Sequence, residues 1–309
     1  MLETMGHQGG LGLRRFLGRR MARKVGRASL SREAPVDVQR QRMDHAGDRL
    51  PPPKGVHIDR ISYAGLQALR FTPVKPAPGA ILYLHGGGYS RGSAQSHKPL
   101  VARLSTLLNM SAISVDYRLA PEHQCPAAVE DGAAALAEIC AEADGPVLLA
   151  GDSAGGGLAL SSVIRQRQAG GVMPAALYLI SPWTDLSLSG ASVKARAGAD
   201  PMLTPGNLKA GADLYLGQLD SRDPEASPLF ADLAGLPPVF IQVGEDEVLL
   251  DDAVRLHDAL EAAGVETRCE VWQAMWHDFQ LFAPLISEAD AALARARDWL
   301  APHLAADQA

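Results

Sequence analysis

The chain of 309 residues is long enough to enclose one large hydrophobic core, and 47% of its residues are hydrophobic. Its formal net charge of -6 gives no reason to expect a nucleic-acid partner, and no apolar run is long enough to cross a membrane. Three cysteines, Cys125, Cys140 and Cys269, lack C-x-x-C spacing, which argues against a zinc site or a disulfide framework and favours a reducing compartment. The composition therefore predicts a soluble, cytoplasmic protein.

The N-terminal segment differs in charge from the rest of the chain. Residues 1–50 carry 11 Lys and Arg against 5 Asp and Glu, a balance of +6 that leaves -12 for the remainder. The apolar stretch from Leu11 to Leu17 is interrupted by two arginines, too early for a secretory signal peptide. We interpret the segment as a solvated extension leading into a helix, while an anionic-membrane contact and an organelle transit peptide stay open. Pro51-Pro52-Pro53 divides residues 1–53 from a domain over residues 54–309.

Beyond the prolines, short apolar strands alternate with longer helical stretches. This alternation is typical of an α/β fold in which a mostly parallel sheet is covered by helices on both faces. Eight strands are predicted, near residues 56–62, 66–71, 80–84, 111–116, 146–150, 175–181, 238–243 and 266–272. Residues 186–225 break the alternation and predict an insertion.

A glycine-rich motif, His85-Gly86-Gly87-Gly88, follows the predicted strand at 80–84. Bare backbone can approach a substrate closely, and aimed N–H groups stabilise the oxyanion that forms in acyl transfer. Gly86 and Gly87 are the predicted donors, together with the N–H of Ala154. A simple chain reversal is the alternative interpretation of this motif taken alone.

The motif Gly151-Asp152-Ser153-Ala154-Gly155-Gly156 lies between an apolar strand and a predicted helix. Glycines on both sides of a serine remove the Cβ atoms that would clash in the strained turn of a nucleophile elbow. The pentapeptide alone is weak, because the chain has 30 glycines, but its strand-to-helix setting favours function. Ser153 is therefore the predicted nucleophile.

A base and a carboxylate are expected downstream, each on a loop after a later strand. The predicted strand at 266–272 leads to His277, which alone among nine histidines lies on such a loop. The predicted strand at 238–243 leads to two adjacent carboxylates, Asp246 and Glu247. His277 is the predicted base, and either carboxylate could orient it.

These motifs resemble the hormone-sensitive-lipase-like branch of the α/β-hydrolases, the bacterial family IV esterases, over roughly residues 35–305. The matching stretches are His85 to Tyr89, Asp116 to Glu122, Gly151 to Gly156, Ser181 to Leu186 and the segment around His277. The resemblance implies an α/β-hydrolase fold with a helical cap, made from the N-terminal segment and residues 186–225. It also implies a Ser-acid-His triad with Ser153 and His277, and an oxyanion hole from Gly86, Gly87 and Ala154.

Spacing in the resembled family favours Glu247 as the acid. Counted from Glu247, Leu249 occupies the apolar position two places on, and Asp251 occupies the carboxylate position four places on. The count then runs without a gap to Gly264, at the end of a helix, whereas Asp246 would need a one-residue slip. Glutamate can orient an imidazole as aspartate does, so the predicted triad is Ser153, Glu247 and His277, with Asp246 as the alternative acid.

Four further residues near the motifs have two interpretations each. Tyr89 and Trp183 are candidates for lining the substrate pocket, and core packing is the alternative. Arg118 and Glu122 could form a charged catalytic pair, but we favour structural support of the glycine loop by the strand end at residues 116–118.

The resemblance predicts hydrolysis of short- to medium-chain carboxylic esters through an acyl-enzyme, with no metal or organic cofactor. A deacetylase or lactone hydrolase would use the same residues. An interfacial lipase is not favoured by the aromatic content of 5%, and a non-catalytic ligand-binding protein on the same fold is disfavoured by the presence of His277. The expected partner is a small-molecule ester, and the oligomeric state, a homodimer included, stays open.

Overall fold

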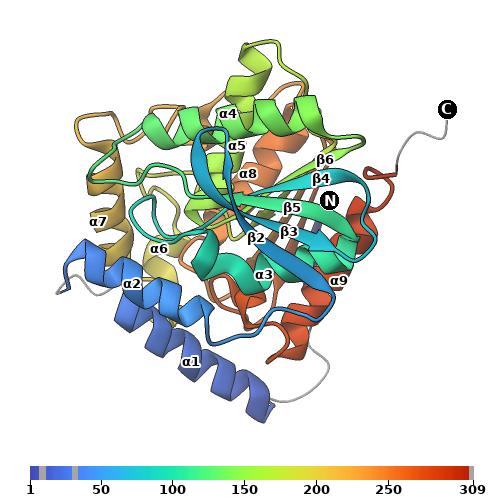
Figure 1. Cartoon of the computed structure of the whole chain (residues 1–309). Coiled ribbons are helices and arrows are strands. Elements are labelled where there is room, and N and C mark those ends of the chain that lie inside the picture. Colours follow the sequence, from blue (N-terminus) through green and yellow to red (C-terminus); the bar gives the residue numbers. More distant parts are fainter. Residues whose placement is uncertain (7–11, 30–33, 306–309) are drawn as a thin grey trace.

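The computed structural model describes residues 1–6, 12–29 and 34–305. A nine-stranded sheet crosses it (Figure 1), in the strand order β1-β9-β8-β7-β6-β4-β5-β3-β2. The strands are β1 (Leu2–Met5), β2 (Val56–Tyr63), β3 (Leu66–Pro73), β4 (Ala77–Leu84), β5 (Met110–Val115), β6 (Val147–Asp152), β7 (Ala176–Ile180), β8 (Val239–Gly244) and β9 (Thr267–Trp272). Neighbouring strands are parallel except that β3 runs antiparallel to both β2 and β5.

Helices cover both faces of this sheet, as the α/β pattern predicts (Figure 1). They are α1 (Leu13–Ser29), α2 (Val36–Gly47), α3 (Ala94–Leu108), α4 (Ala127–Glu142), α5 (Ala154–Gln168), α6 (Ser192–Ala195), α7 (Pro205–Leu216), α8 (Leu250–Ala262) and α9 (Ser287–Leu300), with 3-10 turns η1 (Pro228–Phe230) and η2 (Phe279–Phe282). Buried side chains of α4, α5 and α8 belong to one core, and those of α3 and α9 to the other.

The strands supply both cores because successive side chains of a strand point to opposite faces. In β4, Leu82 and Leu84 pack against the α4 and α5 face, while Ile81 and Tyr83 pack against the α3 and α9 face. A strand buried on both faces must be apolar throughout, which explains the continuous apolar runs of the sequence.

The sheet has one strand more than the eight predicted, which are all present as β2 to β9 within about three residues of their predicted bounds. The extra strand, β1, pairs in parallel with β9 at the sheet edge, with Leu2 opposite Cys269. Glu3 accepts charged hydrogen bonds from Arg268 at 2.7 Å and Arg295 at 3.0 Å. The start of the basic segment is therefore part of the sheet rather than a solvated arm, and Glu3 is held by partners 265 and 292 residues away.

Helices α1 and α2 lie side by side at the periphery of the molecule, where α2 also packs against α3 (Figure 1). Leu11, part of the apolar stretch considered in the sequence, is outside the described residues. Among the helices that can be described, none has the length and apolar character needed to traverse a bilayer.

Candidate active site

Four loops meet at the carboxyl edge of the central strands. β9, β8 and β6 end in the loops that carry His277, Glu247 and Ser153, and β4 ends in the glycine motif. Parallel strands direct all four loops to the same edge of the sheet, where α/β folds place their ligands.

Ser153 occupies a sharp turn between β6 and α5, with a left-handed φ of 52°. The turn packs tightly, because a Cβ on Gly155 would lie 2.0 Å from the carbonyl oxygen of Leu84. A Cβ on Gly151 would lie 2.3 Å from the carbonyl oxygen of Gly155. Both flanking glycines are therefore required, and the serine side chain is 6% exposed.

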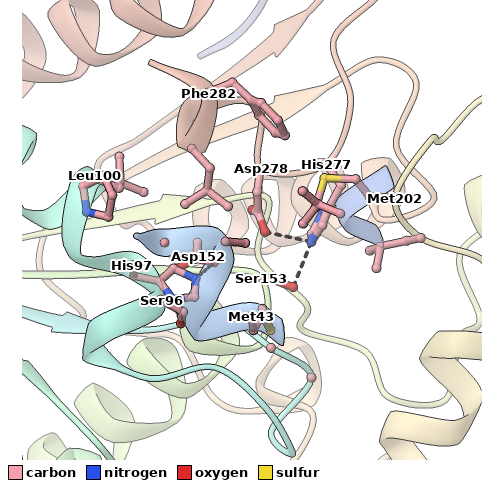
Figure 2. A pocket seen from close by; sticks show the side chains of 18 of the residues that line it. Met43, Ser96, His97, Leu100, Asp152, Ser153, Met202, His277, Asp278 and Phe282 are labelled. Carbon is pink, nitrogen blue, oxygen red and sulfur yellow. Dashed lines mark hydrogen bonds and ion pairs between the residues drawn. The ribbon is translucent and has the colours of Figure 1, made fainter. Parts of the chain in front are cut away.

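A continuous hydrogen-bonded chain links three of the predicted site residues. The Ser153 hydroxyl donates to Nε2 of His277 at 2.9 Å (Figure 2), and Nδ1 of His277 donates to Glu247 Oε2, also at 2.9 Å. This arrangement requires the neutral imidazole to carry its proton on Nδ1. The structure thus brings Ser153, His277 and Glu247 together at the sheet edge.

The Glu247 carboxylate is fully buried and held from two further sides. Ser181 Oγ donates to Oε1 at 2.7 Å, and the N–H of Gly244 donates to the same oxygen at 2.5 Å. The adjacent Asp246 instead accepts a 2.8 Å charged hydrogen bond from Arg19 of α1. Only Glu247 of the two neighbouring carboxylates contacts His277.

The glycine loop differs from its prediction at one position. The N–H of Gly86 donates to Asp152 Oδ1 at 3.0 Å, so it is already engaged by a carboxylate. Gly87 and Gly88 line the cavity beside Ser153, whereas Gly86 does not. Gly87 has φ +125°, and a Cβ there would lie 2.2 Å from the carbonyl oxygen of Arg91. The N–H of Gly86 is therefore occupied by Asp152 and is not free to donate to an oxyanion, contrary to the expectation from the sequence.

Asp152 anchors this loop from beneath the nucleophile. Its Oδ1 also accepts from the Tyr83 hydroxyl at 2.6 Å, and its Oδ2 lies 3.1 Å from Nε2 of His97 on α3. Burial alone would raise the pKa of Asp152, but His97 and these hydrogen bonds lower it below its ordinary value. Burial alone would lower the pKa of His97, and Asp152 raises it instead. The two form a buried, charged pair.

Asp278 is a second carboxylate beside the imidazole. Its Oδ2 lies 3.0 Å from Nε2 of His277, the atom that also contacts Ser153 (Figure 2). Burial lowers the pKa of His277, yet the carboxylates of Asp278 and Glu247 outweigh it and hold the pKa well above its ordinary value. Burial raises the pKa of Asp278 to about 7. Asp278 therefore competes with Ser153 for Nε2.

An apolar cavity of about 130 Å³ opens onto Ser153 and His277 (Figure 2). Its walls come from elements far apart in the chain. They include Met21 of α1, Met43 of α2, Leu100 of α3, Phe282 of η2, and Met202 from the segment between α6 and α7. Lining residues between positions 21 and 25, between 43 and 50, and between 202 and 208 thus lie around the reactive side chains.

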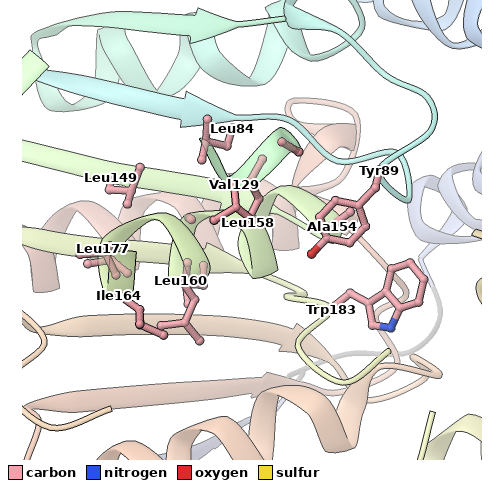
Figure 3. Close-up of a cluster of buried hydrophobic side chains, with 14 of the residues drawn as sticks. Leu84, Tyr89, Val129, Leu149, Ala154, Leu158, Leu160, Ile164, Leu177 and Trp183 are labelled. Atoms are coloured by element: carbon pink, nitrogen blue, oxygen red, sulfur yellow. The ribbon is translucent and has the colours of Figure 1, made fainter. Parts of the chain in front are cut away.

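The two aromatic pocket candidates lie side by side in the buried core (Figure 3), with their ring centroids 5.9 Å apart. Trp183 lines the cavity. Tyr89 is a core residue: it is 1% exposed, and its ring stacks on Tyr215 of α7 at 3.9 Å between centroids. Tyr89 does not line the cavity beside Ser153, and its ring packs between Tyr215 and Trp183.

Arg118 and Glu122 do not pair with each other. Arg118 forms an ion pair with Asp131 at 2.8 Å, and Glu122 binds Arg40 of α2 at 2.7 Å. Support of the glycine loop comes instead from Tyr117, whose hydroxyl donates to the carbonyl oxygen of His85 at 2.7 Å. These contacts agree with a structural role for residues 116–118 in supporting the glycine loop, rather than with a catalytic pair of Arg118 and Glu122.

Two polar residues of the site, His97 and Asp278, were not singled out in the sequence. Asp278 directly follows His277 in the sequence, and this adjacency is the one sequence feature that points to a role for it near the imidazole. His97 lies within a helix, 55 residues before Asp152, and its role depends on packing that the sequence does not display.

Comparison with known proteins is consistent with this geometry. The model of the alpha/beta hydrolase fold family matches residues 81–281. An acetyl-hydrolase of Streptomyces hygroscopicus is 39% identical over 256 residues, which cover 82% of this chain and 85% of that protein.

Solved structures are similar over nearly the whole chain. EstE5 soaked with p-nitrophenyl butyrate has a TM-score of 0.89 and 38% identity, covering 96% of this chain and 100% of that one. An esterase from the bacterial hormone-sensitive lipase family has a TM-score of 0.89 and 34% identity, covering 97% and 100%. With the fold, the family model and these relatives in agreement, this chain belongs to the hormone-sensitive-lipase-like esterases of the α/β-hydrolase superfamily.

Proposed function

We propose that this protein hydrolyses short- to medium-chain carboxylic esters, with Ser153 as nucleophile, His277 as base and Glu247 as the acid of the triad. The observation that carries the proposal is the hydrogen-bonded chain from Ser153 through His277 to Glu247, which opens onto an apolar cavity. A serine held in a strained turn against an imidazole is the arrangement that nucleophilic acyl transfer requires.

In this mechanism, Nε2 of His277 accepts the proton of Ser153 while Oγ attacks the ester carbonyl carbon. The resulting tetrahedral oxyanion collapses, the alcohol leaves with the proton from His277, and an acyl-serine remains. Water then attacks the acyl-serine with the same base and releases the carboxylic acid. Glu247 stabilises the imidazolium that forms in both steps.

The oxyanion donors that we propose are the N–H groups of Gly87, Gly88 and Ala154. Gly87 and Gly88 line the cavity next to Ser153. Ala154 is the first residue of α5, and the N–H groups of a first helical turn have no acceptor within their own helix. Such donors typically contribute about two to three orders of magnitude in rate. Gly86 supports the loop by its bond to Asp152.

The cavity favours small acyl groups. A cavity of about 150 Å³ lined by apolar side chains holds a molecule of the size of benzene. At about 130 Å³, this cavity suits acyl chains of up to roughly six carbons. The Streptomyces relative is named an acetyl-hydrolase, so acetyl esters are the first substrates to examine and a deacetylase activity is the second candidate.

We further propose that residues 1–53 and about 186–225 form the cap of a catalytic domain over residues 54–309. Met21 and Met43 from the first segment, and Met202 from the second, line the same cavity. A covering of this kind excludes water from the acyl-enzyme. The cysteines of this chain are unpaired in the structure, which fits the cytoplasmic location that we propose.

The test is the hydrolysis of p-nitrophenyl esters with acyl chains of two to about twelve carbons by wild type and Ser153→Ala. Loss of the nucleophile should reduce kcat by about a million-fold. Ser287→Ala, an exposed serine at the start of α9, is the matched control and should retain full activity. Turnover that survives in Ser153→Ala would refute the mechanism, and an N-acetylated amine panel would identify a deacetylase.

A further inference from the structure

Helix α1 presents an unusual outward face. Surface helices ordinarily bury their apolar side chains and expose their polar ones. Here Leu13, Phe16 and Leu17 are 73%, 57% and 52% exposed. The structure thus displays the large apolar side chains of the first helical turns to solvent.

The inward face of α1 combines charged contacts with small residues packed against the core, where Ala22 is 0% exposed. Arg15 is 5% exposed and lies 3.9 Å from Glu288, and Arg19 forms a 2.8 Å ion pair with Asp246. Gly18 packs so closely that a Cβ would lie 2.8 Å from Ile286. Ion pairs and close packing on the inward side therefore hold the helix in this orientation, which leaves Leu13, Phe16 and Leu17 on its outward side.

The outward face is also cationic. Arg14, Arg20, Arg23 and Lys24 are exposed on the same side of the helix as Phe16 and Leu17. Across the part of the chain that the structure describes, no carboxylate forms an ion pair with any of these four. A helix with exposed Leu and Phe beside unpaired Lys and Arg has the composition of an interfacial membrane helix.

The apolar surface continues onto a neighbouring segment next to the cavity. Leu285, 39% exposed, lines a surface hollow together with Leu17 and Met21. Met21 also lines the cavity that contains Ser153. Figure 1 shows α1 as the outermost helix of this side of the molecule. The exposed face and the reactive serine are therefore separated by the wall that Met21 helps to form.

We propose that this outward face, consisting of Leu13, Arg14, Phe16, Leu17, Arg20, Arg23, Lys24 and Leu285, docks on an anionic lipid surface. Apolar side chains would insert shallowly between acyl chains, and the cations would bind lipid phosphates. A stable protein interface buries about 800 Å² on each partner, far more than these few apolar side chains offer, whereas shallow insertion needs no more than this. Esters dissolved in the bilayer would reach the cavity beside Met21, a consequence that rests on the proposed function, although docking itself does not.

The experiment is co-sedimentation of the full chain with vesicles of phosphatidylcholine, alone or with about a third of phosphatidylglycerol. The wild type should bind the anionic vesicles at low salt, and binding should weaken strongly at about 0.5 M salt, where charges are screened. Ser153→Ala should bind equally well, so that docking is measured independently of ester hydrolysis.

Two sets of variants test the two components of the face. Phe16→Ser with Leu17→Ser should weaken binding about tenfold or more, because two inserted side chains are lost. The matched control replaces Val74 and Val172, which are 79% and 66% exposed on other parts of the surface, by Ser and should bind as wild type.

Arg20→Gln, Arg23→Gln and Lys24→Gln together should weaken binding about a hundredfold, on the basis of roughly fivefold for each cation. Lys54→Gln, Lys75→Gln and Lys194→Gln, which are exposed elsewhere, form the control. The surface variants, unlike Ser153→Ala, should hydrolyse dissolved p-nitrophenyl acetate at the wild-type rate. If wild type and surface variants bind vesicles as expected but hydrolyse no ester, the proposed function fails and the docking proposal stands.

The proposal is overturned if the wild type does not bind anionic vesicles, or if the two sets of α1 variants bind these vesicles as tightly as the wild type. It is equally overturned if light scattering shows that Phe16 and Leu17 hold two copies of the chain together, or if the face binds nucleic acid in place of lipid.

Discussion

The Glu247 carboxylate lies 2.9 Å from Nδ1 of His277, while the carboxylate of its neighbour Asp246 binds Arg19 of α1 at 2.8 Å. The difference arises because the N–H of Gly244 and the hydroxyl of Ser181 hold Glu247 in place. Two adjacent carboxylates therefore have separate tasks, one at the imidazole and the other at the N-terminal helix.

Glu247→Gln should reduce kcat by about ten-thousand-fold, because an amide no longer stabilises the imidazolium and favours the wrong tautomer. Asp246→Asn is the control and should keep kcat within about threefold, with some loss of stability from the Arg19 contact. Steady-state kinetics on p-nitrophenyl acetate measure both. Equal losses in the two variants would contradict the assignment of the acid.

Asp278→Asn should move the acid limb of the kcat/KM profile to lower pH by about one unit or more. The base must be neutral to accept the Ser153 proton, and the Asp278 carboxylate at 3.0 Å favours the imidazolium. Removing that charge lowers the pKa of His277, so activity persists to lower pH.

The other charged groups that face this imidazole remain in the Asp278→Asn variant. They are Glu247, Asp200 and the pair of Asp152 with His97. A purely structural role for Asp278 would lower activity at every pH alike, and an unmoved acid limb would refute competition for Nε2. Asp246→Asn again serves as the charge-matched control.

His97→Ala should lower the free energy of unfolding by about 3–5 kcal/mol, since it leaves the Asp152 carboxylate buried without its charged partner. The sign of the pH dependence follows from both pKa shifts. The raised pKa of His97 stabilises the fold below pH 6.5, and this contribution is lost as the pH rises through the folded pKa. The lowered pKa of Asp152 stabilises the fold above pH 3.8 and is lost as the pH falls through the folded value.

The effect of His97→Ala should therefore be larger near pH 6 than near pH 9. Urea unfolding at the two pH values measures this difference, with Tyr83→Phe as a variant that removes one neutral donor from the same carboxylate. A destabilisation that is identical at both pH values would mean that the pair is not charged in the folded protein.

Leu100→Ala should extend the acyl chain that is hydrolysed best by about two carbons or more, because Leu100 lines the cavity. Leu104→Ala, one turn further along α3, is the matched control, since Leu104 is 1% exposed but packs in the core. Both variants should lose about 2–5 kcal/mol of stability, yet only Leu100→Ala should change chain-length preference. A panel of p-nitrophenyl esters distinguishes them.

Some features of this protein are local in the sequence and were predictable from it. The strand, turn and helix around Ser153 follow from an apolar run and flanking glycines, whose clash distances show why only glycine fits there. Eight strands and the position of His277 follow likewise from periodicity and chain order.

Other features depend on contacts between distant segments. The N–H of Gly86 binds Asp152, 66 residues away, which is why we propose the glycines beyond it as the oxyanion donors. The ring of Tyr89 meets Tyr215 across the core, and β1 finds its partner in β9. No local pattern encodes these pairings.

The sequence by itself determined the fold class and the placement of Ser153 and His277 on loops that follow strands, because turn geometry and strand order depend on neighbouring residues. The tertiary structure alone decided which backbone N–H groups are free, that Asp278 shares Nε2 of His277, and that α1 turns its apolar side chains outward. The physical reason is that hydrogen-bond partners, burial and exposure are properties of residues brought together in space by folding.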